Sequence, residues 1–240
     1  MDFYRRIKNE FTRLSERNNL GAETIQIRVR TLSPEEAIGN PEDKDYPLTK
    51  GRERMMEAEF KGCFGQAFTD MYGNFSGDMN DVLKMELNNN FRRAIFLASF
   101  NAVTRYLGIA DKTVHCKDEA PPICARELVS YIRENFGQPR IAMVGLQPRM
   151  VQALSKEFDL RVVDMDEDNI GHEKFGVTIG APDETPANLA WCDLAFVTGS
   201  ALTNDTLDDL MGSKQTLVFG VTIAGPAACL GLRRFCPYGS

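Results

Sequence analysis

Residues 141–164 decide the fold, and they read IAMVGLQPRMVQALSKEFDLRVVD. A buried strand is expected over Ile141–Val144, because its four residues are continuously apolar. A polar turn follows, and then apolar residues recur at helical spacing from Val151 to Phe158. A second apolar run, Leu160–Val163, ends in an aspartate. Strand, turn, helix and strand in this order predict a parallel sheet.

The same pattern continues through the rest of the C-terminal half. Strands are expected at Leu194–Val197 and Thr216–Phe219, and a helix is expected from Pro121-Pro122 to Gly137. The strands are apolar throughout, which is typical of parallel sheets covered on both faces. The sequence therefore predicts the α/β class, with a Rossmann-like, mostly parallel sheet over residues 111–240.

Residues 1–110 follow a different pattern and predict a separate α+β unit. Alternating apolar and polar residues indicate strands that are exposed on one face, joined here into an antiparallel sheet. The unit is expected to begin with an amphipathic helix that carries Phe3, Ile7, Phe11 and Leu14, followed by a strand over Ile25–Val29 and a loop over 33–53 ordered by Tyr46 and Leu48. A hairpin of Arg54–Phe60 and Cys63–Thr69, which turns at Lys61-Gly62, comes next. A short helix capped by Ser76 and a long buried helix from Phe91 to Tyr106 complete the unit.

Composition narrows the class of protein. The chain has 240 residues, which suits one or two domains, and 43% of them are hydrophobic. The net charge is −6 and no basic patch stands out, so a nucleic-acid partner is not expected. We find no signal peptide and no apolar run long enough to span a membrane, so a cytoplasmic protein with reduced thiols is expected.

Candidate binding residues follow the predicted strands, because ligands of open parallel sheets bind at the carboxyl ends of strands. We expect a cofactor or ligand to contact Gly145, Gln147, Asp164, Asn169, Thr198, Gly199, Ser200, Thr222 and Gly225. Asp164 follows Gly145 at the spacing of a ribose-binding acid, but G-x-G-x-x-G is absent because Gln147 and Met150 replace the later glycines. Ordinary turns and helix caps explain each residue equally well when it is taken alone.

Asp164, Asp166 and Asp168 form a D-x-D-x-D motif. The motif fails as a calcium loop, because Asn169 and Phe175 occupy the positions that need glycine and glutamate. A magnesium or ribose contact and a solvated acidic loop remain as the two interpretations.

The other wall of the expected site comes from outside the parallel sheet. Asp70, Asn101 and His115 are candidate catalytic residues, although a cap and a buried hydrogen bond would explain Asp70 and Asn101. His115, Cys116 and Cys236 are candidate metal ligands, since soft metals favour thiolate and imidazole. Cys124 and His172 could join them, and structural thiols are the alternative.

As a set, seven segments resemble one known family. They are Gly65–Asp70, Leu97–Val103, Thr113–Lys117, Val144–Pro148, Asp168–Gly171, Val197–Ser200 and Arg234–Gly239. The chain resembles the "putative heavy-metal chelation" domain family, formerly a domain of unknown function. The resemblance implies a domain similar to the N-terminal cap of enolase over residues 1–110, a Rossmann-like domain over 111–240, and an active site in the cleft between them. It does not imply enolase activity, since the chain has no room for the catalytic barrel.

Three binding or catalytic functions follow from these observations, and a purely structural or interaction protein is the alternative to all three. The first is binding of a small anionic ligand or metal chelate in the interdomain cleft, with a metal ion or chelate as cofactor. The second is a nucleotide- or S-adenosylmethionine-dependent enzyme, which the Rossmann-like pattern favours. The third is non-catalytic metal binding through the cysteines and His115. A homodimer is the expected assembly, because isologous dimers are the commonest oligomers.

Overall fold

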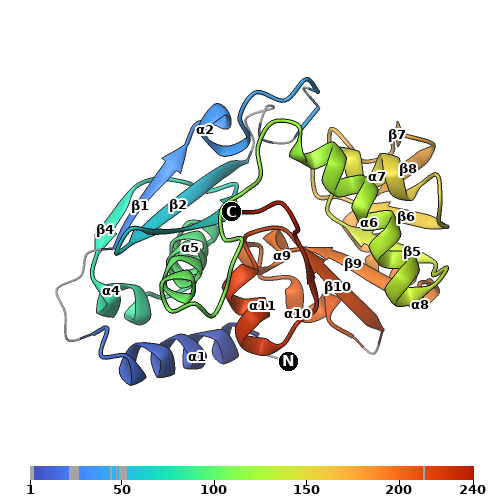
Figure 1. Cartoon of the computed structure of the whole chain (residues 1–240). Helices are drawn as coiled ribbons and strands as arrows, with labels where there is room; N and C mark the ends of the chain where they lie inside the picture. The colour runs from blue at the N-terminus through green and yellow to red at the C-terminus, as the bar shows by residue number, and fades with distance from the viewer. Residues whose placement is uncertain (1–2, 22–26, 44, 47, 49–52, 213) are drawn as a thin grey trace.

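The computed structural model describes residues 3–21, 27–43, 45–46, 48, 53–212 and 214–240. Two sheets organise the chain, one antiparallel and one mostly parallel (Figure 1). The predicted α/β class is thereby confirmed. Ile25 and Gln26, the expected start of the first strand, lie outside the described residues.

The first sheet has four antiparallel strands in the order β3-β2-β1-β4. These are β1 Ile27–Leu32, β2 Arg54–Phe60, β3 Cys63–Thr69 and β4 Phe75–Gly77. The predicted hairpin is confirmed, because Phe60 pairs with Cys63 around a two-residue turn. Both turn residues, Lys61 and Gly62, have positive φ, as the favoured hairpin turn requires.

Four helices described in the first part are α1 Phe3–Arg17, α2 Pro34–Ile38, α4 Met79–Lys84 and α5 Asn90–Tyr106. The prediction that Ser76 caps the short helix is wrong, since Ser76 lies in β4. Asp78 caps α4 instead, because its carboxylate accepts from the Asp81 amide and Asp81 reciprocates. α2 occupies part of the loop expected over residues 33–53, where Ser33 and Glu36 form a capping box.

The second sheet has seven strands in the order β11-β10-β9-β5-β6-β8-β7, all parallel except the β7–β8 pair. They are β5 Ile141–Val144, β6 Leu160–Val163, β7 Glu173–Lys174, β8 Val177–Gly180, β9 Leu194–Thr198, β10 Gln215–Phe219 and β11 Arg234–Phe235. The four predicted strands are confirmed, and β7, β8 and β11 extend the sheet at its two edges.

The helices of the second part are α6 Ala120–Phe136, α7 Pro148–Leu154, α8 Thr185–Trp191, α9 Ser200–Thr203, α10 Leu207–Leu210 and α11 Ala224–Leu230, with a 3₁₀ turn at Pro182–Glu184. α7 ends at Leu154, before Phe158, so it is shorter than predicted. α9 begins directly after Gly199, and Thr203 and Asn204 lie at its end.

Helices cover both faces of the parallel sheet, which explains its continuously apolar strands. Ile141 and Met143 pack on the side of α6 and α7, where Leu128 and Val151 are buried with them. Ala142, Ala195, Val197 and Val218 point to the other side, into one core that they share with α1, α5 and the first sheet. α5 thus lies between the two sheets (Figure 1).

Candidate functional site

Asp164 follows β6 and organises the carboxyl edge of the parallel sheet. Its Oδ2 accepts a hydrogen bond from the Leu146 amide at 2.6 Å, and its Oδ1 accepts from the Asp166 amide at 2.9 Å. The side-chain amide of Asn169 also donates to Oδ1, at 3.2 Å. Asp164 therefore holds the turn after β5 and the acidic loop after β6 together.

The D-x-D-x-D motif folds upon itself. Asp166 Oδ1 accepts from the Asp168 amide at 3.1 Å, and Asp166 Oδ2 accepts from Asn169 Nδ2 at 3.3 Å. Asn169 is buried, so its amide serves mainly to fix this loop. Asn169 Nδ2 thereby links the carboxylates of Asp164 and Asp166 within the loop after β6.

The polar residues after β5 and β9 act mainly as turn and cap residues. Gly145 has φ of 91°, and a Cβ there would lie 2.6 Å from Thr198 Cγ2. Gln147 caps α7 through the Met150 amide. The Gly199 amide donates to the Phe219 carbonyl and the Ser200 amide to Thr198 Oγ1, which closes the turn into α9.

Asp70 and Glu53 bring carboxylates from the first half of the chain to the same edge. Glu53 immediately precedes β2, and Asp70 immediately follows β3. Burial, followed by the charges of Asp164, Asp70 and Asp166 in that order, raises the pKa of Glu53 to about 7. We call these four side chains, Glu53, Asp70, Asp164 and Asp166, the acidic edge.

A chain of polar contacts joins the two halves beside the acidic edge. Asn90, at the start of α5, donates to Asp70 Oδ1 at 2.7 Å and to Asn204 Oδ1 at 3.3 Å. Asn204 in turn lies 3.5 Å from the sulfur of Met165, between Asp164 and Asp166. Arg93 donates to Asn90 Oδ1 at 2.9 Å, which fixes the amide orientation of Asn90.

Asn101, Thr222 and Gly225 meet in the packed boundary between the halves and not across a cleft. Asn101 is fully buried on α5, and its Nδ2 donates to the carbonyls of Val221 and Thr222. Thr222 Oγ1 accepts from the Phe68 amide at 3.0 Å. These side chains join the two halves of the chain. The alternative expectation for Asn101, a buried hydrogen bond, therefore describes its surroundings.

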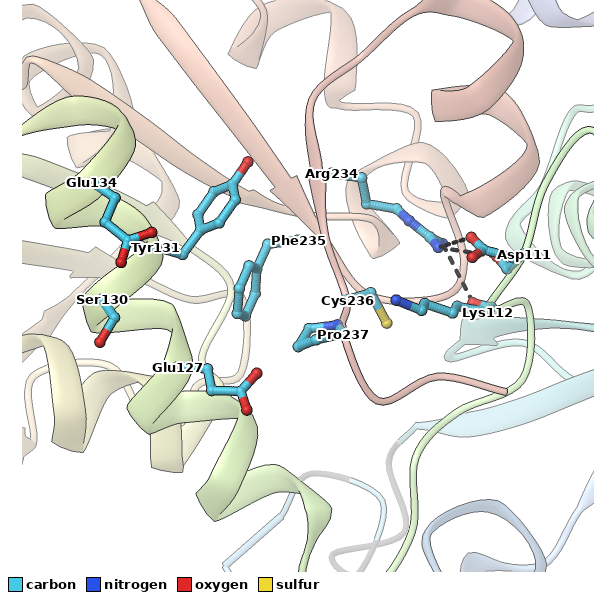
Figure 2. A pocket seen from close by; sticks show the side chains of 10 residues that line it. All are labelled: Asp111, Lys112, Glu127, Ser130, Tyr131, Glu134, Arg234, Phe235, Cys236 and Pro237. Carbon is cyan, nitrogen blue, oxygen red and sulfur yellow. Dashed lines mark hydrogen bonds and ion pairs between the residues drawn. The ribbon is translucent and has the colours of Figure 1, made fainter.

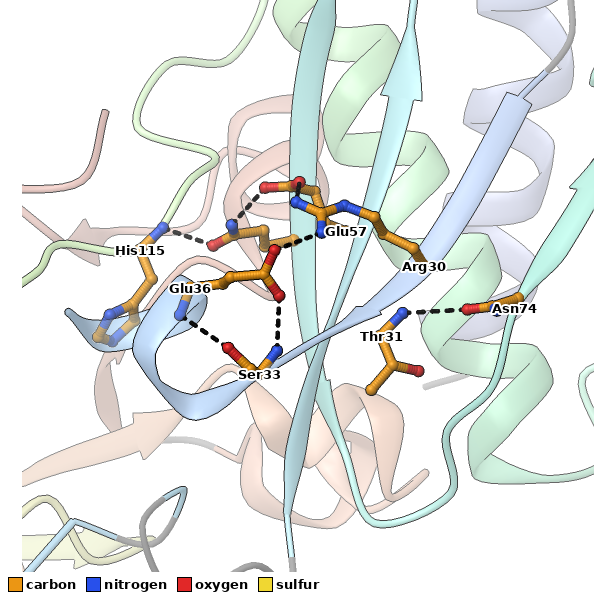
Figure 3. A network of polar contacts seen from close by, with 8 residues as sticks. Arg30, Thr31, Ser33, Glu36, Glu57, Asn74 and His115 are labelled. Atoms are coloured by element: carbon orange, nitrogen blue, oxygen red, sulfur yellow. Dashed lines mark hydrogen bonds and ion pairs between the residues drawn. The ribbon is translucent and has the colours of Figure 1, made fainter.

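His115 is held by a network that crosses the first sheet (Figure 3). Its backbone amide donates to Gln66 Oε1 at 2.7 Å, and Gln66 Nε2 donates to Glu57 Oε2 at 2.7 Å. Arg30 pairs with Glu57 and Glu36 at the far end. Burial lowers the pKa of His115, and Nδ1 lies 2.5 Å from the Cys116 carbonyl. A neutral ring donating from Nδ1 keeps Nε2 as its acceptor.

A cavity of about 430 Å³ lies between α6 and the C-terminal tail, away from the acidic edge. Glu127 and Glu134 on α6 line one wall, whereas Lys112, Arg234 and Cys236 line the other (Figure 2). A volume of this size suits a small ligand.

The thiols of the candidate metal ligands Cys116 and Cys236 influence the pKa values of each other or of Cys124. Burial raises the pKa of Cys116 to about 12, and the charge of Cys236 contributes to this shift. Burial also raises the pKa of Cys124, with contributions from the other two thiols. Among the described residues, no group of three or more histidines, cysteines or carboxylates is arranged to hold a metal ion.

Sequence reasoning missed Glu53 and Asn90 as members of the site. Glu53 lies in a stretch without periodicity. Two of the three carboxylates that act on it, Asp164 and Asp166, lie more than 100 positions away, so the sequence carried no local signal for it. Asn90 is the first residue of α5, directly after the cap residue Asn89, and was not among the expected site residues. In the described part of the chain, no helix is long and apolar enough to cross a membrane.

Comparison with known proteins gives a family match for part of the chain and a similar fold. Residues 128–239 match the family model of DUF364, described as "Putative heavy-metal chelation". A DUF364 protein of unknown function from Pyrococcus horikoshii has a similar structure, with TM-score 0.57 and 17% identity over 90% of this chain and 78% of that chain. Another, from Desulfitobacterium hafniense, has TM-score 0.50 and 15% identity over 74% and 73%. No curated protein matches.

Proposed function

We propose, from the match of residues 128–239 to the DUF364 family model, that the protein binds a metal ion, carried in a small organic chelate, at the acidic edge. One observation carries the proposal: Glu53 is placed against carboxylates from both halves, and its pKa is raised to about 7. Burying like charges together is unfavourable unless a proton or another cation neutralises them. A bound cation would relieve this repulsion.

The charge of the edge favours a metal chelate over the free anion that was the other expected ligand. Asp70, Asp164 and Asp166 would repel an anion and attract a cation. Since no three of the described carboxylates are arranged to hold a bare metal ion, the organic chelate would supply most of the coordination. When bound, the metal would supply positive charge and open coordination positions. Glu53 would then give up its proton, while Asp164 would keep the two adjoining turns in place.

Exposed apolar side chains beside the acidic edge favour a ligand with an organic part. Met165 is 62% exposed between Asp164 and Asp166. Met71 and Tyr72, directly after Asp70, are 46% and 50% exposed. Apolar surface next to carboxylates suits a cation surrounded by carbon-rich groups better than it suits a hydrated ion.

The nucleotide alternative receives less support from the geometry. Asp164, the expected ribose contact, already accepts three hydrogen bonds from Leu146, Asp166 and Asn169. Gly145 lies against Thr198, so a phosphate would find the turn after β5 occupied by a side chain.

The division of the chain at residue 110 is part of the proposal. The antiparallel sheet lies wholly before this position and the parallel sheet wholly after it, which supports an enolase-cap-like unit followed by a Rossmann-like one. The acidic edge would then be built from both units.

The test measures metal in the wild-type protein and in matched variants. Protein purified without chelators is analysed by native mass spectrometry and elemental analysis, and is then titrated with Zn(II) alone and with Zn(II) bound to 1,10-phenanthroline, a flat apolar chelator. Glu53→Gln and Asp70→Asn are expected to weaken chelate binding about tenfold each, or roughly 1.4 kcal/mol. Glu59→Gln, on an exposed position of β2, is the control. Equal binding by all four proteins would overturn the proposal.

A further inference from the structure

One face of α6 is polar where it meets the C-terminal tail. Four side chains at positions i, i+3, i+4 and i+7 share this side of the helix, and these are Glu127, Ser130, Tyr131 and Glu134. That spacing is typical of the apolar face that a helix buries. Here it lines the cavity of about 430 Å³ between α6 and the tail (Figure 2), whereas a different face of α6 is buried in the core. This polar face is therefore available to a ligand.

The opposite wall of the cavity is cationic, because Lys112 and Arg234 line it (Figure 2). The Arg234 guanidinium is 11% exposed and lies 3.9 Å from Asp111 Oδ1, so its charge already has a partner. Arg234 also donates to the Lys112 carbonyl at 3.4 Å. Lys112 is held there with a φ of 52°, which is uncommon for a residue other than glycine. Its side chain extends toward Cys236 in the tail (Figure 2).

Several polar groups of the cavity have no partner within the protein. In the described part of the chain, the Lys112 amine, the Tyr131 hydroxyl and the Glu134 carboxylate form no hydrogen bond or ion pair. Glu127 differs from them, because its carboxylate accepts a hydrogen bond from the Tyr238 hydroxyl. Lys112 and Glu134 thus line one cavity from opposite walls without neutralising each other. Both charges remain available to a third molecule.

An aromatic surface lies between the two charged walls. The ring centroids of Tyr131, on α6, and Phe235, on β11, are 5.2 Å apart, and both residues line the cavity. Aromatic rings offer a flat apolar surface for the carbon skeleton of a ligand. The cavity therefore combines an anionic wall, an apolar middle and a cationic wall, in a volume that suits a small molecule.

We propose that this cavity binds a small zwitterion, an organic molecule with an ammonium group at one end and a carboxylate at the other. Glu134 would receive the ammonium group and Lys112 the carboxylate, while the middle of the ligand lies against Tyr131 and Phe235. A ligand with a single charge would leave one of the two protein charges unmatched, so charge complementarity favours the zwitterion. This site is separate from the acidic edge and does not depend on the function proposed there.

The test titrates the full chain with 4-(aminomethyl)benzoate, a flat zwitterion, by isothermal titration calorimetry at low salt. Two matched compounds, 4-methylbenzoate and 4-methylbenzylamine, each carry only one of its charges. Wild-type protein is expected to bind the zwitterion about tenfold more tightly than either matched compound, or roughly 1.4 kcal/mol. The flexible zwitterion 6-aminohexanoate tests other separations between the two charges. Equal binding of the zwitterion and its matched compounds would overturn the proposal, and so would the absence of binding by both zwitterions.

Variants assign each end of the ligand to one residue. Glu134→Gln should remove the advantage of the zwitterion over 4-methylbenzoate, and Lys112→Gln should remove its advantage over 4-methylbenzylamine. Glu16→Gln on α1 and Lys84→Gln on α4, both at exposed positions, are the controls and should keep both advantages. A variant that only distorts the cavity weakens all three compounds equally, and that result for Glu134→Gln and Lys112→Gln would contradict the assignment. Glu53→Gln should bind the zwitterion as wild type does, which separates this result from that of the acidic edge.

Discussion

Gly225 lies directly against Asn101: its backbone amide donates to Asn101 Oδ1 at 2.7 Å, and a Cβ at residue 225 would be 3.0 Å from that same oxygen. Through its Nδ2, Asn101 donates to the Gln66 carbonyl at 2.9 Å. One buried side chain thus bonds to β3 in the first half and to the start of α11 in the second. This contact therefore joins the two halves inside their packed boundary.

Replacing Asn101 with alanine should destabilise the fold strongly. The change leaves the buried Gly225 amide and the Gln66 and Val221 carbonyls without this partner, and it opens a small void. Each buried polar group left unsatisfied costs about 1–3 kcal/mol, so a total loss of about 3–5 kcal/mol is expected in urea unfolding. Asn135→Ala, which removes one exposed hydrogen bond to Tyr131, should change stability by less than about 0.5 kcal/mol. Similar values for the two variants would contradict the role given to Asn101.

Gly225→Ala should be destabilising although alanine is the better helix former. The added methyl would meet Thr104 Oγ1 at 2.6 Å as well as Asn101, both on the rigid helix α5. Overpacking of this kind costs about 1–3 kcal/mol, measured as a lower midpoint of thermal unfolding. Gly212→Ala is the control, because a Cβ there meets nothing within 4 Å. A neutral or stabilising Gly225→Ala would show that α11 can move away from α5.

The sequence was sufficient for elements whose signal is local. The hairpin around Lys61-Gly62 and the strands Ile141–Val144 and Leu160–Val163 follow from apolar patterns and turn chemistry alone. α2 could also have been found, since Ser33 and Glu36 have the spacing of a capping box. Its short length inside a polar stretch hid that signal.

The site could be predicted only in part, because its chemistry depends on long-range contacts. Asp164 was recognisable from its place after a strand, but the approach of Glu53 to it depends on how the two sheets pack. In the sequence, Asn101 and Thr222 are polar residues that could bind a ligand. In the structure, they form hydrogen bonds with other parts of the protein. No local pattern distinguishes a polar side chain that joins two sheets from one that meets a ligand.

Arg149 on α7 fastens the segment after α2 to the second half, and replacing it with methionine should loosen that segment. Its guanidinium lies 3.1 Å from Asp43 Oδ2 and 2.7 Å from Asp45 Oδ2 and is 12% exposed. Both carboxylates are 40% exposed or more, so the expected loss of stability is about 1–2 kcal/mol, below that of a fully buried pair. Limited proteolysis should show faster cleavage near Asp43.

The control for this variant is Arg133→Met, which breaks the exposed ion pair of Arg133 with Glu157. It should leave both stability and cleavage near wild type. An Arg149 variant that resists protease as the control does would show that the segment is held by its apolar contacts alone.

Glu53 should make stability fall as pH rises from about 4.5 to 7. Its pKa moves from 4.5 to about 7 on folding, so the folded protein binds more protons than the unfolded chain within this window. The favourable contribution is fully present below pH 4.5 and is lost as pH rises through 7. Glu53→Gln removes this dependence, so the variant should gain on wild type by about 1–3 kcal/mol between pH 5 and 8. Urea unfolding at both pH values measures the gain, and Glu59→Gln, which lacks the buried carboxylate neighbours, should run parallel to wild type. If stability depends on pH in the same way in Glu53→Gln and in wild type, the carboxylates are kept apart in solution. The acidic edge would then lack the repulsion that a metal cation is proposed to relieve.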